Sequence, residues 1–185
     1  MHTMILCLGN ERMPGDGIAA RVGRILKILP LPISMSVRVA NTLDWECVDT
    51  IVECDQLIVV DAMTSGHEPG MCFVEEVSPE YSPTFSLYCR HRQVVKDIVE
   101  LTQLLALEGA TKRLVFIGVE VGGTREEDKD DLSGLASSVP LVVDSVLRSF
   151  GAEVALRRMV TKAQEQVEAE ANVANGWDVR IRGAA

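Results

Sequence analysis

An apolar strand, a polar loop and an amphipathic helix follow one another at the start of the chain. Residues 5–8 (ILCL) form an apolar run that is typical of a strand buried on both faces. Residues 9–15 (GNERMPG) predict a loop, and apolar residues recur at helical spacing over residues 18–26. Ligands bind at the carboxyl ends of the strands in open α/β sheets, so this loop is a candidate site.

Asp16 is the acidic residue that ends this loop, and it has two interpretations. It occupies the N-cap position of the predicted helix, where a carboxylate commonly caps the backbone. Alternatively, its carboxylate binds a ligand. The loop contains neither G-x-G-x-x-G nor G-K-[ST], and a carboxylate at its mouth would repel phosphate. A cation or a hydrogen-bond donor is therefore the expected ligand.

Strand and helix patterns alternate along the rest of the chain. Strands are expected at residues 33–39, 57–60, 71–77 and 113–119, a turn followed by a short helix at residues 41–54, and helices at residues 94–105 and 132–150. The strand at 57–60 (LIVV) is expected to end at Asp61, and the strand at 71–77 to be an antiparallel edge strand. This order predicts an α/β fold whose mostly parallel sheet is covered by helices on both faces.

Finer features of the pattern give further expectations. The helix within residues 41–54 is expected to bury the face that carries Trp45, Val48, Ile51 and Val52. Pro140 is expected to mark the start of the helix at 132–150, or a kink near it.

Domain boundaries follow from where the apolar pattern weakens. Residues 1–150 are expected to form one domain, and residues 151–185 a C-terminal helix, at 157–171, with a loose tail. Residues 122–131 (GGTREEDKDD) predict a solvated connection.

Composition limits the possible partners and the compartment. A chain of 185 residues with 47% hydrophobic residues is about one compact domain. No apolar run approaches the ~20 residues of a membrane span. The first ten residues carry no basic region or cleavage site, which predicts a cytoplasmic protein. The net charge of −9 argues against a nucleic acid as partner.

Cysteine and histidine usage limits thiol and imidazole chemistry. The five cysteines include no C-x-x-C pair, and their odd number predicts free thiols that are mostly buried. The three histidines are His2, His67 and His91.

Three potential ligands are expected at one edge of the sheet. Asp16 follows the first strand, Asp61 ends the central strand, and His91 begins the helix at 94–105. Parallel strands end at the same edge, so these side chains, far apart in sequence, are expected to meet there. Two carboxylates and an imidazole suit a divalent transition metal such as nickel or zinc. Burying Asp61 beside the sheet requires a cation or a donor.

Three motifs together resemble a known family. They are GNERMPGDG, LIVVDAMTSGHEPG, and LVFIGVEVGG followed by LSGLASSVPLVVDSVL. These are similar to the G-N-x4-D-[DE]-G loop, the V-D-A…P-G strand and turn, and the G-(I/V)-(E/Q) strand before an L-S helix of the nickel–iron hydrogenase maturation endopeptidases. The resemblance covers residues 3–150 in order and at matching spacing.

The resemblance implies a fold, a reaction and a set of site residues. The family fold is a three-layer αβα sandwich. Its members remove a short C-terminal extension from the large-subunit precursor of a nickel–iron hydrogenase after nickel insertion. Asp16, Asp61 and His91 would bind the nickel that the substrate brings, or another divalent ion in the isolated protein. Hydrolysis would follow from polarisation of the scissile carbonyl or of a water by the metal.

Departures from the family pattern leave alternatives open. Gly15 stands where the family has the first acid of its loop pair, and Cys89 fits the histidine position less well than His91. Glu11 and Asp44 are candidates for a catalytic base. A non-catalytic module that checks a metal-loaded partner is the second hypothesis. An unrelated αβα hydrolase or phosphorylase is a third, which the lack of a phosphate loop disfavours.

Overall fold

The fold is known from a computed structural model of the full sequence. It describes residues 1–10, 12–13, 15–77, 87–110, 112–122 and 133–149, together with residues 163, 166, 167 and 169.

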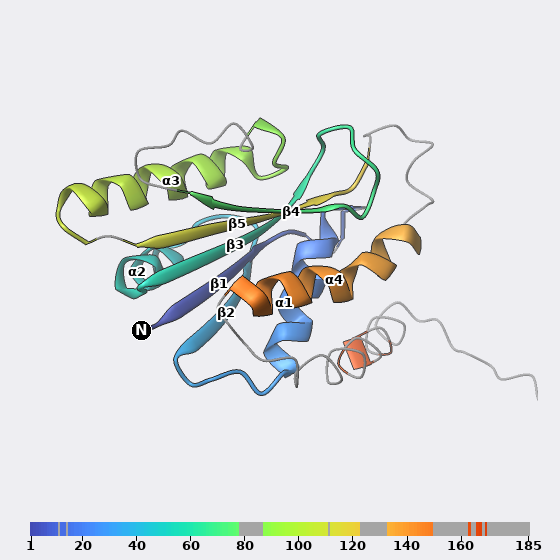
Figure 1. Ribbon diagram of the computed structural model, residues 1–185, viewed down its shortest axis with the longest axis horizontal. Helices are drawn as coiled ribbons and strands as arrows, with labels where there is room; N and C mark the ends of the chain where they lie inside the picture. Colours follow the sequence, from blue (N-terminus) through green and yellow to red (C-terminus); the bar gives the residue numbers. More distant parts are fainter. Residues whose placement is uncertain are drawn as a thin grey trace, which may run out of the picture.

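A five-stranded sheet forms the middle layer (Figure 1). The strands are β1 (Thr3–Leu8), β2 (Met35–Ala40), β3 (Gln56–Met63), β4 (Cys72–Val77) and β5 (Arg113–Glu120). Their order is β2-β1-β3-β5-β4; β4 pairs antiparallel with β5, and the other pairs are parallel. The predicted mostly parallel sheet with one antiparallel edge strand is therefore confirmed.

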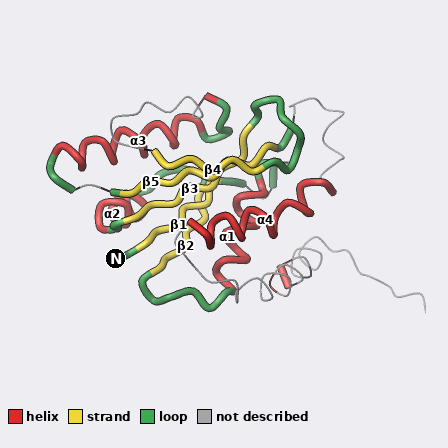
Figure 2. The backbone as a smooth tube through the Cα atoms, in the orientation of Figure 1, coloured by secondary structure: helices red, strands yellow, loops and turns green. Residues whose placement is uncertain are grey.

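Helices cover both faces of this sheet (Figure 2). They are α1 (Gly17–Ile28), α2 (Trp45–Glu53), α3 (Arg92–Leu107) and α4 (Ser133–Ser149). The apolar sides of α1 and α4 pack in one core, and those of α2 and α3 pack in a second core. The central strands β1 and β3 are buried along their whole length, as expected for parallel strands between two helical layers. The fold is thus the predicted αβα sandwich.

β3 is longer than its sequence pattern indicates. It continues past Asp61 to Met63, because β5 pairs with it as far as Met63 and Glu120. The prediction that the strand ends at Asp61 is therefore wrong. Asp61 lies inside the strand, between apolar residues that are themselves buried, and its side chain has no exposed surface.

The predicted buried face of α2 is confirmed only in part, because Ile51 is buried whereas Trp45 and Val52 are exposed. Cys47 and Ile51, four residues apart, are the buried residues of this helix. Trp45 is 83% exposed, because a residue two positions before Cys47 points to the opposite side of a helix.

α4 begins at Ser133, so Pro140 lies inside it and does not mark its start. Its apolar side from Val139 to Leu147 is buried against α1 as predicted.

Parts of the sequence predictions lie outside the described residues. Apart from Gly122, the loop predicted at 122–131 is among them, as is most of the segment 151–185. The described residues of that segment are helical, and Ala163 and Val167 are buried in the core that contains α1 and α4. The domain division at residue 150 stays a prediction. Within the described part of the chain, no helix has the length and apolar character to span a membrane.

Candidate functional site at the carboxyl edge of the sheet

Asp16, Asp61 and His91 meet at the point where the sheet reverses its strand order. From β1 the chain passes through α1 to β2 on one side, and later returns to β3 on the other side. Asp61 lies in β3 beside Leu8, the last residue of β1. Asp16 directly precedes α1, and His91 directly precedes α3. Open α/β sheets bind their ligands in the crevice at such a reversal.

The three side chains are close enough to share one ligand. One ligand atom from each lies within 4.8 Å of the others. His91 Nδ1 lies 2.8 Å from Asp61 Oδ1 and 3.8 Å from Asp16 Oδ1. The side chains of Asp16 and His91 are 11% and 14% exposed, whereas that of Asp61 is fully buried. Asp16 and His91 are therefore the members that remain open to solvent.

Asp61 holds His91 through both of its carboxylate oxygens. The backbone N–H of His91 donates to Asp61 Oδ2 at 3.0 Å, and the ring Nδ1 lies 2.8 Å from Oδ1. Burial raises the pKa of the Asp61 carboxyl, and the hydrogen bond to Asp61 raises the pKa of His91. Both shifts favour the retention of a proton between the two side chains, which avoids an uncompensated negative charge on the buried Asp61.

Asp16 closes its loop and does not cap the helix. It occupies the N-cap position of α1, but its side chain makes no capping hydrogen bond. Its Oδ2 instead accepts the backbone N–H of Asn10 at 3.0 Å, which ties the end of the loop to its beginning. The capping interpretation is therefore wrong, and the second carboxylate oxygen faces His91.

The backbone explains why position 15 carries no acid. Gly15 has a φ of +75°, a conformation that side-chain-bearing residues adopt at a cost of about 1–2 kcal/mol. A Cβ there would lie 3.3 Å from Val121 Cβ and 3.5 Å from a guanidinium nitrogen of Arg90. The missing acid thus fits the shape of this loop, and Asp16 alone supplies the carboxylate.

The segment before α3 is attached to the end of β3 by backbone bonds that the sequence pattern does not reveal. Arg90 N–H donates to Ala62 O at 2.9 Å, Thr64 N–H donates to Tyr88 O at 2.8 Å, and Cys89 forms an antiparallel bridge with Met63. These contacts fix the position of His91 relative to Asp61. The residues joined are some 24 to 28 positions apart, and no local signal predicts such a pairing.

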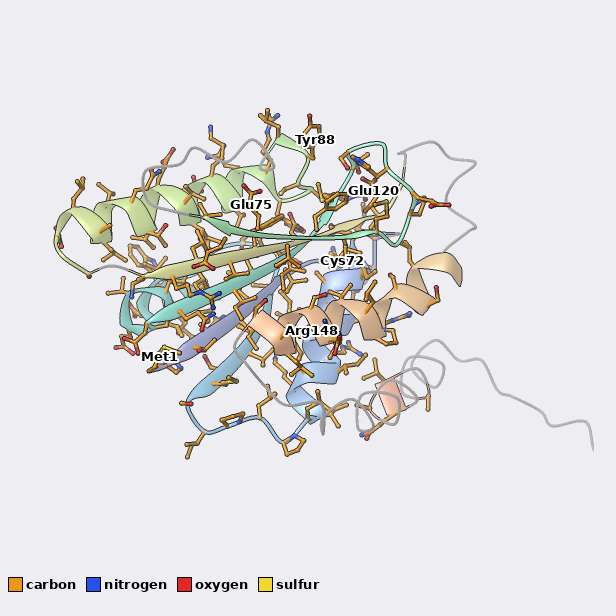
Figure 3. The ribbon with its side chains drawn as sticks, in the orientation of Figure 1. Met1, Cys72, Glu75, Tyr88, Glu120 and Arg148 are labelled. Carbon is orange, nitrogen blue, oxygen red and sulfur yellow. The ribbon has the colours of Figure 1, made fainter. Side chains whose placement is uncertain are left out.

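Glu120 is a second buried carboxylate, and it orders the turn after β3. The sequence motifs assign it no such role. Figure 3 shows Glu120 at the end of the sheet opposite Met1. The Glu120 side chain is fully buried and accepts hydrogen bonds from Ser65 N at 2.8 Å, Ser65 Oγ at 2.5 Å and Gly122 N at 3.1 Å. Glu120 therefore holds the start of the β3–β4 connection beside the site.

The two candidate bases receive no support. Asp44 caps α2 by accepting the N–H of Cys47 at 2.8 Å, and it also pairs with Arg38 at 2.7 Å. Its carboxylate is thus occupied by structural bonds. Glu11 lies outside the described residues.

The donor set fits a divalent transition metal. Two carboxylates and one imidazole are ligands that zinc and nickel accept, and three ligands leave coordination positions for a substrate. The cluster is built on β3 and on the residues before two helices, so it needs little rearrangement to close around an ion. An ion carried by a substrate would replace the proton that the Asp61–His91 pair holds.

The raised pKa of His91 predicts a pH-dependent stability. A group with a raised folded-state pKa stabilises the protein below its unfolded pKa, about 6.5 for histidine, and this stabilisation is lost as the pH rises through the folded pKa. The raised pKa of Asp61 acts in the same direction. We expect the free energy of unfolding in urea to fall as the pH rises above about 6.5, and to fall less in His91→Gln. If the free energy of unfolding changes equally with pH in the wild type and in His91→Gln, the pairing of His91 with Asp61 does not stabilise the protein.

Thiol reagents are expected to leave the site intact. None of the five cysteines forms a disulfide, and burial raises the pKa of Cys7 to about 12 and also raises that of Cys89, next to the site. Buried, protonated thiols react slowly. Treatment with iodoacetamide under native conditions should leave unchanged the precursor cleavage that the sequence motifs imply. The Cys89→Ser variant should also keep this activity. Rapid inactivation that this substitution prevents would identify Cys89 as a functional thiol.

Comparison with known proteins places this fold in one structural class. No protein-family model and no curated protein sequence matches the chain. Solved structures do match. The hydrogenase maturating endopeptidase HybD from E. coli aligns at a TM-score of 0.59 with 19% identity, covering 82% of this chain and 94% of that chain. An endopeptidase from Escherichia coli aligns at 0.61 with 22% identity over 83% and 96% of the two chains.

A third solved structure belongs to the same class. The [NiFe] hydrogenase maturation protease HybD from Thermococcus kodakarensis aligns at a TM-score of 0.51 with 18% identity, over 80% of this chain and 98% of that chain. The chain therefore has the fold of the hydrogenase maturation endopeptidases. This fold agrees with the family that the sequence motifs resemble.

Proposed function

We propose that this protein is an endopeptidase that removes the C-terminal extension of a nickel–iron hydrogenase large-subunit precursor after nickel insertion. The observation that carries the proposal is the convergence of Asp16, Asp61 and His91 at the strand-order reversal of a maturation-endopeptidase fold. The three family motifs support it independently, since each falls on a segment that forms this edge. We place the reaction in the cytoplasm.

Nickel enters the proposed reaction as part of the substrate. Its thiolate ligands belong to the precursor, and the carboxylates of Asp16 and Asp61 and the His91 ring offer the ligands that complete its coordination. Binding the metal fixes the neighbouring peptide bond at the edge of the sheet, which supplies the orientation that catalysis requires.

Each residue has a distinct part in this arrangement. Asp16 and His91 are partly exposed and make the first contact with the metal region of the precursor. Asp61, buried beneath them, orients His91 and supplies negative charge. Hydrolysis adds a water across the amide, so that the carbonyl carbon gains the hydroxyl and the leaving nitrogen gains the proton.

Precursor cleavage tests the proposal. Purified protein is incubated with a nickel-loaded large-subunit precursor, and mass spectrometry follows the release of the C-terminal peptide. The proposal predicts one released peptide and a shortened large subunit. Binding of the precursor without cleavage would favour the alternative hypothesis, a non-catalytic module that checks the metal-loaded partner.

A further inference from the structure

A polar groove lies beside the Asp16 loop, at the β2 side of the sheet. It has a volume of about 420 Å³ and lies between α1 and the end of β2. Ala20, Arg24 and Lys27 line it from α1, and Val39 and Asn41 line it from the β2 side. Residues spaced by three and four positions lie on one face of a helix, so these three α1 residues form a continuous wall.

The groove shares a residue contact with the candidate site. Gly9 and Asn10 line the groove, and the N–H of Asn10 donates to Asp16 Oδ2 at 3.0 Å. Gly9 N–H donates to Ala40 O at 3.0 Å, which joins the loop to the last residue of β2. Asn10 therefore connects the groove to the candidate site.

The charge of the groove is opposite to that of the protein. The sequence of α1 contains Arg21, Arg24 and Lys27 and no acidic residue, although the chain as a whole has a net charge of −9. The described residues that line the groove include two cations and two carboxamides and no carboxylate. Such a surface attracts an anionic ligand.

The open edge of β2 favours an extended peptide over a small anion. Among the described residues, β2 pairs only with β1. The carbonyls of Ser34 and Ala40 bind β1, so the alternation of a parallel strand directs the backbone groups of Val37 and Val39 to the open edge. Exposed edges of this kind bind extended peptides by adding a strand.

We infer that this groove binds an extended acidic segment of the peptide substrate, with a carboxylate at Lys27 and its backbone along the end of β2 at Val39. The identity of the peptide, a part of the precursor next to the cleaved bond, rests on the proposed function. The groove gives the site a preference for substrates whose flanking residues are acidic.

The test measures peptide binding without cleavage. The probe is a ten-residue peptide in which every second residue is glutamate, because alternate side chains of an extended chain share one face. Its control is the same peptide with glutamine at those positions. Fluorescence anisotropy gives the affinities, and amide shifts in NMR spectra locate the binding surface. We expect tighter binding of the glutamate peptide and shifts confined to α1, β2 and residues 9–10.

Charge-reversal variants complete the test. Lys27→Glu should weaken binding of the glutamate peptide by about 10-fold, since attraction becomes repulsion, and Lys27→Arg should bind it like the wild type. Lys96→Glu is the matched control, an exposed lysine on α3 across the sheet. Equal affinity for both peptides, equal effects of the two reversals, or the same shifts with free glutamate would overturn the inference. If the protein cleaves the precursor but does not bind the glutamate peptide, the inference about the groove is wrong and the proposed function is still supported.

Discussion

Replacement of Asp61 by alanine is expected to lower precursor processing by more than about 100-fold. Loss of a residue that only orients a metal-binding histidine typically costs 10- to 100-fold. Before an ion binds, Asp61 orients His91 through two hydrogen bonds, and it also belongs to the proposed set of ligands. Asp16→Ala and His91→Ala are expected to cause losses of the same order.

The measurement is the initial rate of peptide release, accompanied by urea unfolding of each variant. Asp61→Asn separates charge from volume, because it fills the same space and still accepts one hydrogen bond. Asp49→Asn, at an exposed position of α2, is the control. Wild-type rates in Asp61→Ala, from a folded protein, would remove Asp61 from the mechanism.

Replacement of Gly9 by alanine is expected to damage both stability and activity. A Cβ at this position would lie 2.4 Å from the carbonyl oxygen of Asp16 and 3.2 Å from Ala20 N. Both atoms belong to the backbone, so the start of α1 must move to accommodate the methyl group. Such overpacking costs about 2–3 kcal/mol. Displacement of Asp16 by about 1 Å should lower processing about 100-fold.

Gly109→Ala provides the control for this substitution. Gly109 has a φ of +84° and open space around its Cβ position, far from the site in sequence and beyond the end of α3. It should lose about 1–2 kcal/mol from backbone strain and keep its processing rate. If Gly9→Ala also loses stability but keeps its processing rate, the close approach of Gly9 to the Asp16 carbonyl does not fix the geometry of the site.

The meeting of the three candidate ligands was predictable because it follows from topology. Strands that alternate with helices form a parallel sheet, and side chains at the carboxyl ends of its strands converge. Asp16, Asp61 and His91 each follow or precede an element that the apolar pattern identifies. Their roles stay predictions until variants are assayed.

Features that depend on contacts between distant residues were not predictable. The bridge between Met63 and Cys89, and the bonds from Ser65 to Glu120, join residues tens of positions apart without any local pattern. Asp16 illustrates a different difficulty. Its position is that of a helix cap, and only the fold of the loop directs its carboxylate to Asn10.

We propose that the site recognises a metal that its substrate carries. A comparison of nickel-free with nickel-loaded precursor tests this most directly. The same preparation of the protein is given nickel-free precursor and nickel-loaded precursor, and release of the C-terminal peptide is measured for each. Two carboxylates and one histidine leave coordination positions that the precursor's own metal ligands fill. The account predicts cleavage of the nickel-loaded precursor only, even when metal is added to the enzyme beforehand. Equal rates with the two precursors would contradict it.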